Sequence, residues 1–221
     1  MANTPAMSLT PIYWGLAGLL ATLYLARVGD PPGRTRTLLK TLSVAALALV
    51  ALIGGGFILL VIALLLCALG DFFLSRPGEA SLRAGMAAFA AGHLVYIGLL
   101  INQGGGLGYD VLRILIQIAV AGAAGGVALW LWPDLGEMRR PAAAYIAIVA
   151  SMTLLAIGLP PSLWLVSVGA MLFMTSDALL AGEQFKLTAR HASRRWTSPT
   201  VWTLYWLGQA LITAGFLYPV K

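Results

Sequence analysis

The stretch FILLVIALLLCALGDFFLSR, residues 57–76, decides the fold. Fourteen apolar or small residues, 57–70, come before a single aspartate, Asp71, and the first basic residue follows five positions later at Arg76. A run this long and apolar is typical of a helix that crosses a membrane. A carboxylate near the end of such a helix is costly to insert, so Asp71 is a candidate functional residue.

The composition of the whole chain agrees with this stretch. Hydrophobic residues make up 60% of the 221 residues and charged residues only 10%, well below the charged share of a soluble domain. Long runs of alanine and leucine favour helices over the alternating strands of a membrane barrel. We therefore expect an all-α, multi-pass membrane protein of a bacterial inner membrane.

Proline, glycine and charged residues divide the chain into apolar segments of membrane length. We expect one domain over residues 1–221, a bundle of about eight transmembrane helices without a cleaved leader, and Ser198 as the N-cap of the last helix. The expected segments are 11–28, 38–53, 57–74, 82–101, 110–132, 141–158, 162–182 and 200–218.

The net charge of +6 comes from basic residues that gather in alternate loops. Such a pattern indicates membrane orientation and anionic headgroups, not nucleic acid. By the positive-inside rule these loops are cytoplasmic and both termini are non-cytoplasmic. Twelve of the fourteen lysines and arginines follow the pattern: Arg27, Arg34, Arg36, Lys40, Arg76, Arg83, Arg139, Arg140, Lys186, Arg190, Arg194 and Arg195.

A second carboxylate, Asp177 in LFMTSDALLAGE, is predicted at a depth similar to that of Asp71. Asp71 precedes Arg76 by five residues and Asp177 precedes Glu183 by six, which places both roughly 7–9 Å from the cytoplasmic loop charges. The alternative for Asp71 is a structural ion pair with Lys40 or with an arginine at the membrane interface. For Asp177 the alternative is a local hydrogen bond from Ser176.

A few further polar residues are expected inside the bundle, where they could bind or orient a substrate. Glycines precede several polar residues (Gly70, Gly92 and Gly208), and they would let helices approach closely around a polar interior. For the tyrosines a packing role is an equal alternative, and for the histidine a structural hydrogen bond. The candidates are Lys40, His93, Tyr96, Tyr145, Tyr205 and Gln209.

Several motifs, taken in order, resemble the YhhN-type lysoplasmalogenase family. They are LLKTLS (38–43), LGDFFL (69–74), AGHLVYI (91–97), RRPAAAYIAIVASM (139–152), GAMLFMTSDALLA (169–181) and LYWLGQALI (204–212). The sequence departs from the family at Thr41, where a proline usually follows the lysine.

This resemblance implies an eight-helix hydrolase that cleaves the vinyl ether bond of a lysoplasmalogen. The products would be a fatty aldehyde and a glycerophosphoethanolamine or glycerophosphocholine. Such cleavage needs an acid that protonates a carbon of the double bond and a carboxylate that stabilises the cation and activates water. Asp71 and Asp177 can divide these roles, with a lysophospholipid as the partner and with no cofactor or metal.

Two other functions remain open from the sequence. A metal-dependent lipid hydrolase of the alkaline ceramidase type would need Asp71, Asp177 and His93 as zinc ligands, because His93 is the one histidine expected inside the membrane. A transporter would use the two aspartates to carry protons or cations across the bilayer. The aspartates are expected on one side of the membrane, whereas transport sites are expected at its midplane.

Overall fold

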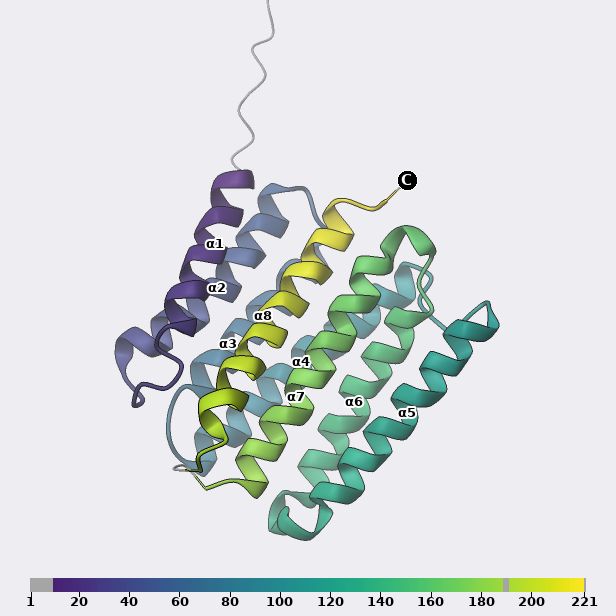
Figure 1. Cartoon of the computed structure of the whole chain (residues 1–221). Helices are drawn as coiled ribbons and strands as arrows, with labels where there is room; N and C mark the ends of the chain where they lie inside the picture. The colour runs from purple at the N-terminus through teal and green to yellow at the C-terminus, as the bar shows by residue number, and fades with distance from the viewer. Residues whose placement is uncertain (1–9, 189–190, 221) are drawn as a thin grey trace, which may run out of the picture.

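The computed structural model describes residues 10–188 and 191–220, and the described part is all α-helical, as predicted (Figure 1). The expectation that the chain has no cleaved leader concerns its N-terminal residues, of which 1–9 lie outside the described residues. Short 3₁₀ turns lie at Trp132–Asp134, Gly136–Met138 and Pro161–Leu163. The helices are α1 (Thr10–Leu25), α2 (Arg34–Ile53), α3 (Ile58–Leu74), α4 (Glu79–Asn102), α5 (Val111–Leu131), α6 (Arg139–Ile157), α7 (Trp164–Lys186) and α8 (Arg194–Leu217).

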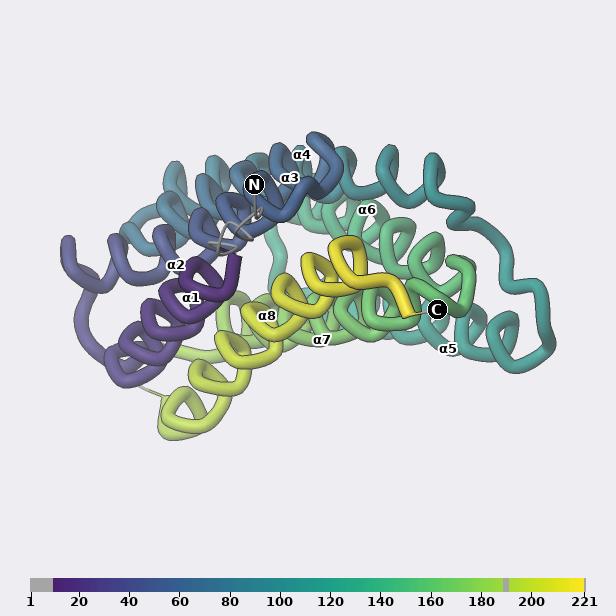
Figure 2. The backbone as a smooth tube through the Cα atoms, turned by 90° about the horizontal axis from the view of Figure 1, so that it is seen from above, coloured from purple at the N-terminus to yellow at the C-terminus, as the bar shows by residue number. Residues whose placement is uncertain are grey.

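Six of these helices form a ring in the order α2, α3, α4, α6, α7, α8, and α8 returns to α2. The other two lie outside the ring, α1 against α2 and α8, and α5 against α6 and α7. Seen from above, the helices form two rows, with α2, α3, α4 and α6 in one and α1, α8, α7 and α5 in the other (Figure 2). Polar side chains on the ring helices can therefore face one another between the rows.

Five helical segments are long and apolar enough to cross a membrane: α2, α4, α5, α6 and α7, some with an adjoining 3₁₀ turn. The apolar helices α1 and α3 are shorter. Many large hydrophobic side chains are exposed, such as Leu112, Ile118 and Leu129 on α5, as expected for a surface that faces lipid. The chain is therefore a multi-pass membrane protein, and the crossing of the membrane by all eight helices stays a prediction.

Small residues bring two helix pairs into close contact, as the sequence indicated. A Cβ atom on Gly208 would lie 2.8 Å from the carbonyl oxygen of Gly169, so α7 and α8 meet where neither has a side chain. A Cβ atom on Gly70 would lie 2.5 Å from the ring of Phe89, which joins α3 to α4. These approaches hold in register the helices that carry Asp71 and Asp177.

The last helix begins earlier than predicted. α8 starts at Arg194, so Ser198 lies inside its second turn and is not an N-cap. Pro199 is accommodated within this helix. Hydropathy identified where the apolar part begins, around residue 200, but the helix extends beyond it through a polar turn. The prediction for Ser198 was therefore wrong, and its hydroxyl serves a different purpose.

The described ends of the chain lie at one end of the bundle (Figure 1). The indole nitrogen of Trp14, near the start of α1, donates a hydrogen bond of 3.3 Å to the hydroxyl of Tyr218, just after α8. Glycines form the turn between α2 and α3 at this same end, where Gly55 has a φ of 74° that favours glycine. The loops that carry most of the basic residues join helices at the opposite end.

Candidate active site

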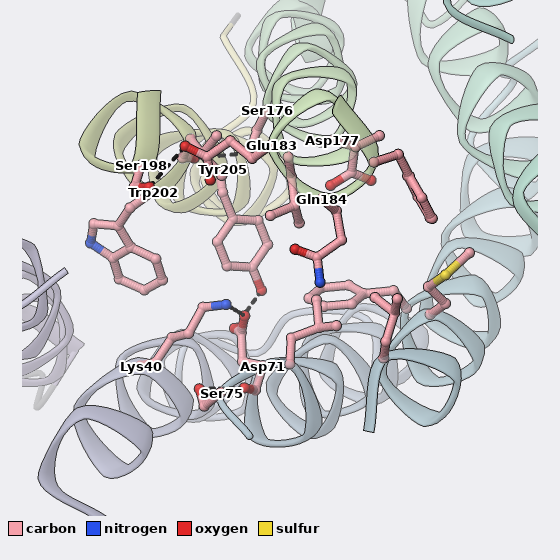
Figure 3. A pocket seen from close by; sticks show the side chains of 18 of the residues that line it. Lys40, Asp71, Ser75, Ser176, Asp177, Glu183, Gln184, Ser198, Trp202 and Tyr205 are labelled. Carbon is pink, nitrogen blue, oxygen red and sulfur yellow. Dashed lines mark hydrogen bonds and ion pairs between the residues drawn. The ribbon is translucent and has the colours of Figure 1, made fainter. Parts of the chain in front are cut away.

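A cavity of about 270 Å³ lies within the ring, near the end that carries the basic loops. Asp71 on α3 and Asp177 on α7 both line it, and they come from facing walls (Figure 3). Of the predicted site residues, Lys40, Tyr145 and Tyr205 line it as well. Helices that are far apart in the sequence thus bring five predicted side chains to one cavity.

Asp71 is completely buried and is held by two donors. The ammonium group of Lys40 lies 3.0 Å from its Oδ1, and the hydroxyl of Tyr205 donates a hydrogen bond of 2.7 Å to its Oδ2. A cation and a phenol on one carboxylate favour its charged form. The ion pair between Lys40 and Asp71, which the sequence offered as the structural alternative, is present, and both residues line the cavity.

Asp177 has a different environment. The Tyr145 hydroxyl donates a hydrogen bond of 2.6 Å to its Oδ2, and the side chain of Asp177 is half-buried. Among the described ion pairs none includes Asp177. Ser176 does not satisfy it, because the Ser176 hydroxyl donates to the carbonyl oxygen of Val201. The two carboxylates of the cavity therefore differ in their partners, which suits different chemical roles.

The remaining predicted residues lie outside the cavity lining. His93, Tyr96 and Gln209 are fully buried, and the Tyr96 hydroxyl donates a 2.7 Å hydrogen bond to Gln209 Oε1. The His93 ring packs 4.6 Å from that of Phe173, which also packs on Tyr205. This aromatic packing makes His93 a neighbour of the site, not a part of its lining.

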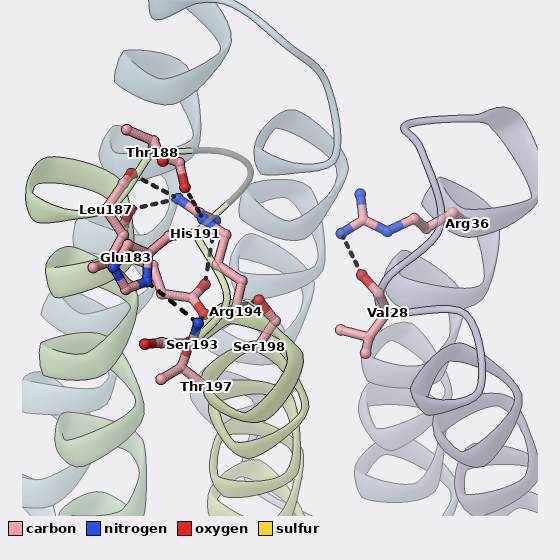
Figure 4. A network of polar contacts seen from close by, with 10 residues as sticks. All are labelled: Val28, Arg36, Glu183, Leu187, Thr188, His191, Ser193, Arg194, Thr197 and Ser198. Carbon is pink, nitrogen blue, oxygen red and sulfur yellow. Dashed lines mark hydrogen bonds and ion pairs between the residues drawn. The ribbon is translucent and has the colours of Figure 1, made fainter.

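A third carboxylate, Glu183, lines the cavity and was not predicted as a site residue. It is buried, accepts hydrogen bonds from the hydroxyls of Thr197 and Ser198, and forms an ion pair of 3.6 Å with Arg194 (Figure 4). Arg194 also donates to the carbonyl oxygens of Glu183, Leu187 and Thr188 at the end of α7. The network ties the start of α8 to the end of α7.

The burial of Glu183 corrects the depth estimate, which treated it as a loop charge. Asp177 lies nine residues before Lys186, the last residue of α7, and so about 13 Å along the helix from that end. Asp71 lies three residues before Leu74, the last residue of α3, or about 5 Å. The carboxylates nevertheless line one cavity, because helix ends do not all lie at the same level.

Asp71, Asp177 and His93 are not assembled as metal ligands. Within residues 10–188 and 191–220, no three side chains of the histidine, cysteine, aspartate and glutamate types lie close enough together to hold an ion. The Nδ1 atom of His93 lies 2.6 Å from the carbonyl oxygen of Phe89, so this nitrogen donates a hydrogen bond within its own helix. The three ligands that the zinc alternative requires are therefore separated. Asp71 and Asp177 line the cavity, whereas His93 lies outside its lining, packed against Phe173.

Apolar helices around a cavity lined by Asp71, Asp177 and Glu183 define a multi-pass membrane protein with a candidate active site inside its helical bundle. Residues 35–216 match the YhhN family, and the chain belongs to that family, as its motifs predicted. Two relatives, from Mycobacterium bovis and Mycobacterium tuberculosis, are each named lysoplasmalogenase. Each is 31% identical over 163 residues, a match that covers 72% of this chain and 60% of the relative. No solved structure matches the chain.

Proposed function

We propose that the protein is a membrane-embedded hydrolase that cleaves the vinyl ether bond of lysoplasmalogens. The observation that carries this proposal is the pair of carboxylates in one cavity, Asp71 bound by Lys40 and Tyr205, and Asp177 bound by Tyr145. Membership of the YhhN family and the name of its mycobacterial relatives support the same reaction. The substrate would be a lysophospholipid that enters from the membrane, with all eight helices spanning it.

The different partners of the carboxylates suggest which one is the acid. Asp71, next to an ammonium group, fits the ionised carboxylate that stabilises a cation and accepts a proton from water. Asp177, which takes part in none of the described ion pairs, fits the acid. Asp177 protonates the β-carbon of the vinyl ether, and an oxocarbenium ion forms. Water then adds to the α-carbon and loses a proton to Asp71, and the hemiacetal collapses to an aldehyde and the glycerol hydroxyl.

A cation at the outer part of the cavity would bind the phosphate of the headgroup. Arg36 and Arg194 both line the cavity, near the end with the basic loops, but Arg194 is engaged by Glu183 and by carbonyl oxygens at the end of α7, so we assign the phosphate to Arg36. Arg36 donates to the carbonyl oxygen of Val28 through one nitrogen, at 3.3 Å, which leaves the rest of its planar fork for other acceptors. Lys40 is engaged by Asp71, so we assign it to the carboxylate and not to the phosphate.

Cleavage in heavy water tests this mechanism. The purified protein, incubated with a lysoplasmalogen in D₂O, should release an aldehyde with one deuterium on the carbon next to the carbonyl group. Hydrogens next to the carbonyl group of a free aldehyde also exchange with D₂O, so the product is trapped rapidly as an oxime. The same aldehyde in protein-free D₂O buffer is the control for this exchange. Aldehyde without deuterium would contradict protonation at carbon. Ion flux in liposomes without any aldehyde would favour the transporter.

A further inference from the structure

A second, apolar groove lies beside Asp177. It runs between α5, α6 and α7, and its volume is about 60 Å³. Most of its lining side chains are half-buried, so the groove can be reached from the side of the bundle, where α5 packs against α6 and α7. The apolar lining includes Ala124, Val127, Ile146, Val149, Met174 and Ala178.

The groove adjoins the candidate catalytic cavity. Tyr145, Ile146, Asp177 and Ala181 line both, so the Asp177 carboxylate and its tyrosine partner stand where the two meet. Asp71, Lys40 and the arginines line the cavity and not the groove. The site therefore has one compartment with charged side chains and one apolar compartment, and the Asp177 carboxylate lines both.

The bond of a vinyl ether lies at the same kind of boundary. Its oxygen belongs to the polar glycerol part, and its two double-bonded carbons are the first two of the hydrocarbon chain. A lipid bound with its phosphate near Arg36 would place that bond between the two compartments. The β-carbon, which must receive the proton, would then point toward the groove and Asp177.

We propose that this groove, between α5, α6 and α7, binds the first carbons of the substrate's hydrocarbon chain and admits the chain sideways from the bilayer. The proposal rests on the proposed function, which supplies the single-chain lipid as substrate. The groove holds only a short part of the chain, and the remainder lies in the bilayer along α5. The side chains that line the groove thus contribute to the affinity for the substrate's hydrocarbon chain.

Filling the groove tests the proposal by kinetics. Ala124 is buried between the three helices, so Ala124→Leu should displace chain carbons from the groove. Each displaced methylene weakens binding about fourfold, so KM for a long-chain lysoplasmalogen should rise by about tenfold or more. KM for a short-chain analogue should rise by a similar factor, because its first carbons would occupy the same groove. The matched control is Ala123→Leu, an exposed position on the same helix, which should behave as the wild type. An unchanged KM for both substrates in a folded Ala124→Leu variant would overturn the proposal.

Photolabelling of the wild-type protein gives a second test that requires neither cleavage nor a variant. The probe is a saturated alkyl-ether lysophospholipid with a diazirine on the carbons next to the ether, in liposomes. Labels that excess unlabelled lysolipid removes should map to Val127, Met174 and their neighbours at the groove. Competed labels on α1, α2 or α8 would contradict the proposal. Competed labelling of the groove without any vinyl ether cleavage would support the groove and refute the proposed function instead.

Discussion

Asp71 and Asp177 show how far single residues could be predicted from sequence. Both were found because a carboxylate in an apolar helix is costly, and Lys40, Tyr145 and Tyr205 because they are polar residues expected inside an apolar bundle. Glu183 and Arg194 were missed, since charges near a helix end look like loop charges; only the packing of α7 on α8 buries Glu183. His93, Tyr96 and Gln209 were placed at the site because helical spacing gives a face, but it does not reveal the aromatic side chains in between.

The position of His93 leads to a prediction at this scale. Its ring lies outside the cavity lining and its Nδ1 donates to the carbonyl oxygen of Phe89, so His93→Gln should keep turnover within about tenfold of wild type. Loss of a zinc ligand would instead remove nearly all of the turnover. The measurement is aldehyde release by the His93→Gln variant. Wild-type protein kept in chelator for a long time is measured in the same way and should also remain active. Loss of activity in chelator, with recovery on adding zinc, would favour the metal-dependent alternative.

At the scale of the helices, glycines decide how closely elements pack. The sequence indicated close approach at Gly70, Gly92 and Gly208, and the structure bears this out. Hydropathy also predicted the ends of most helices to within a few residues, because in these helices the apolar segment and the helix have nearly the same length. It failed at α8, where the helix continues from Trp202 through polar residues to Arg194, which bonds to the end of α7.

Gly169 allows a direct test of the contact between α7 and α8. Its Cβ would lie 2.6 Å from the carbonyl oxygen of Gly208, so Gly169→Val should lower the free energy of unfolding by about 1–3 kcal/mol. Gly122→Val is the matched control, because a Cβ at this helical position on α5 meets no atom within 4 Å. Thermal unfolding in detergent measures both variants. Equal melting temperatures for Gly169→Val and the control would show that the contact is not tight.

For the whole molecule, the sequence predicted an all-α membrane protein, but it could not give the order of the helices in the ring. That order depends on which helices pack against each other, and the hydropathy of the sequence carries no information on this. The described ends of the chain lie at one end of the bundle, and the basic loops lie at the other end, near the cavity. The charge pattern then predicts that the cavity faces the cytoplasm.

Reporter fusions test this orientation. Alkaline phosphatase, which is active only outside the cytoplasm, should be active when fused after Val220. A fusion in the turn between α3 and α4, after Pro77, should be inactive and serves as the control. The reverse pattern would place the cavity at the external surface and would remove the basis for a cytoplasmic headgroup site.

The central claim is that Asp71 and Asp177 act together on one vinyl ether bond, and the most direct measurement is aldehyde release by the single variants. Asp71→Asn and Asp177→Asn should each lower turnover of lysoplasmalogen by at least about a hundredfold, because an amide can neither donate nor accept the required proton. Asp30→Asn, at an exposed carboxylate in the loop after α1, should match the wild type. Unfolding temperatures near that of the wild type would show that both variants remain folded. Near-normal turnover in folded Asp71→Asn or Asp177→Asn would contradict the account.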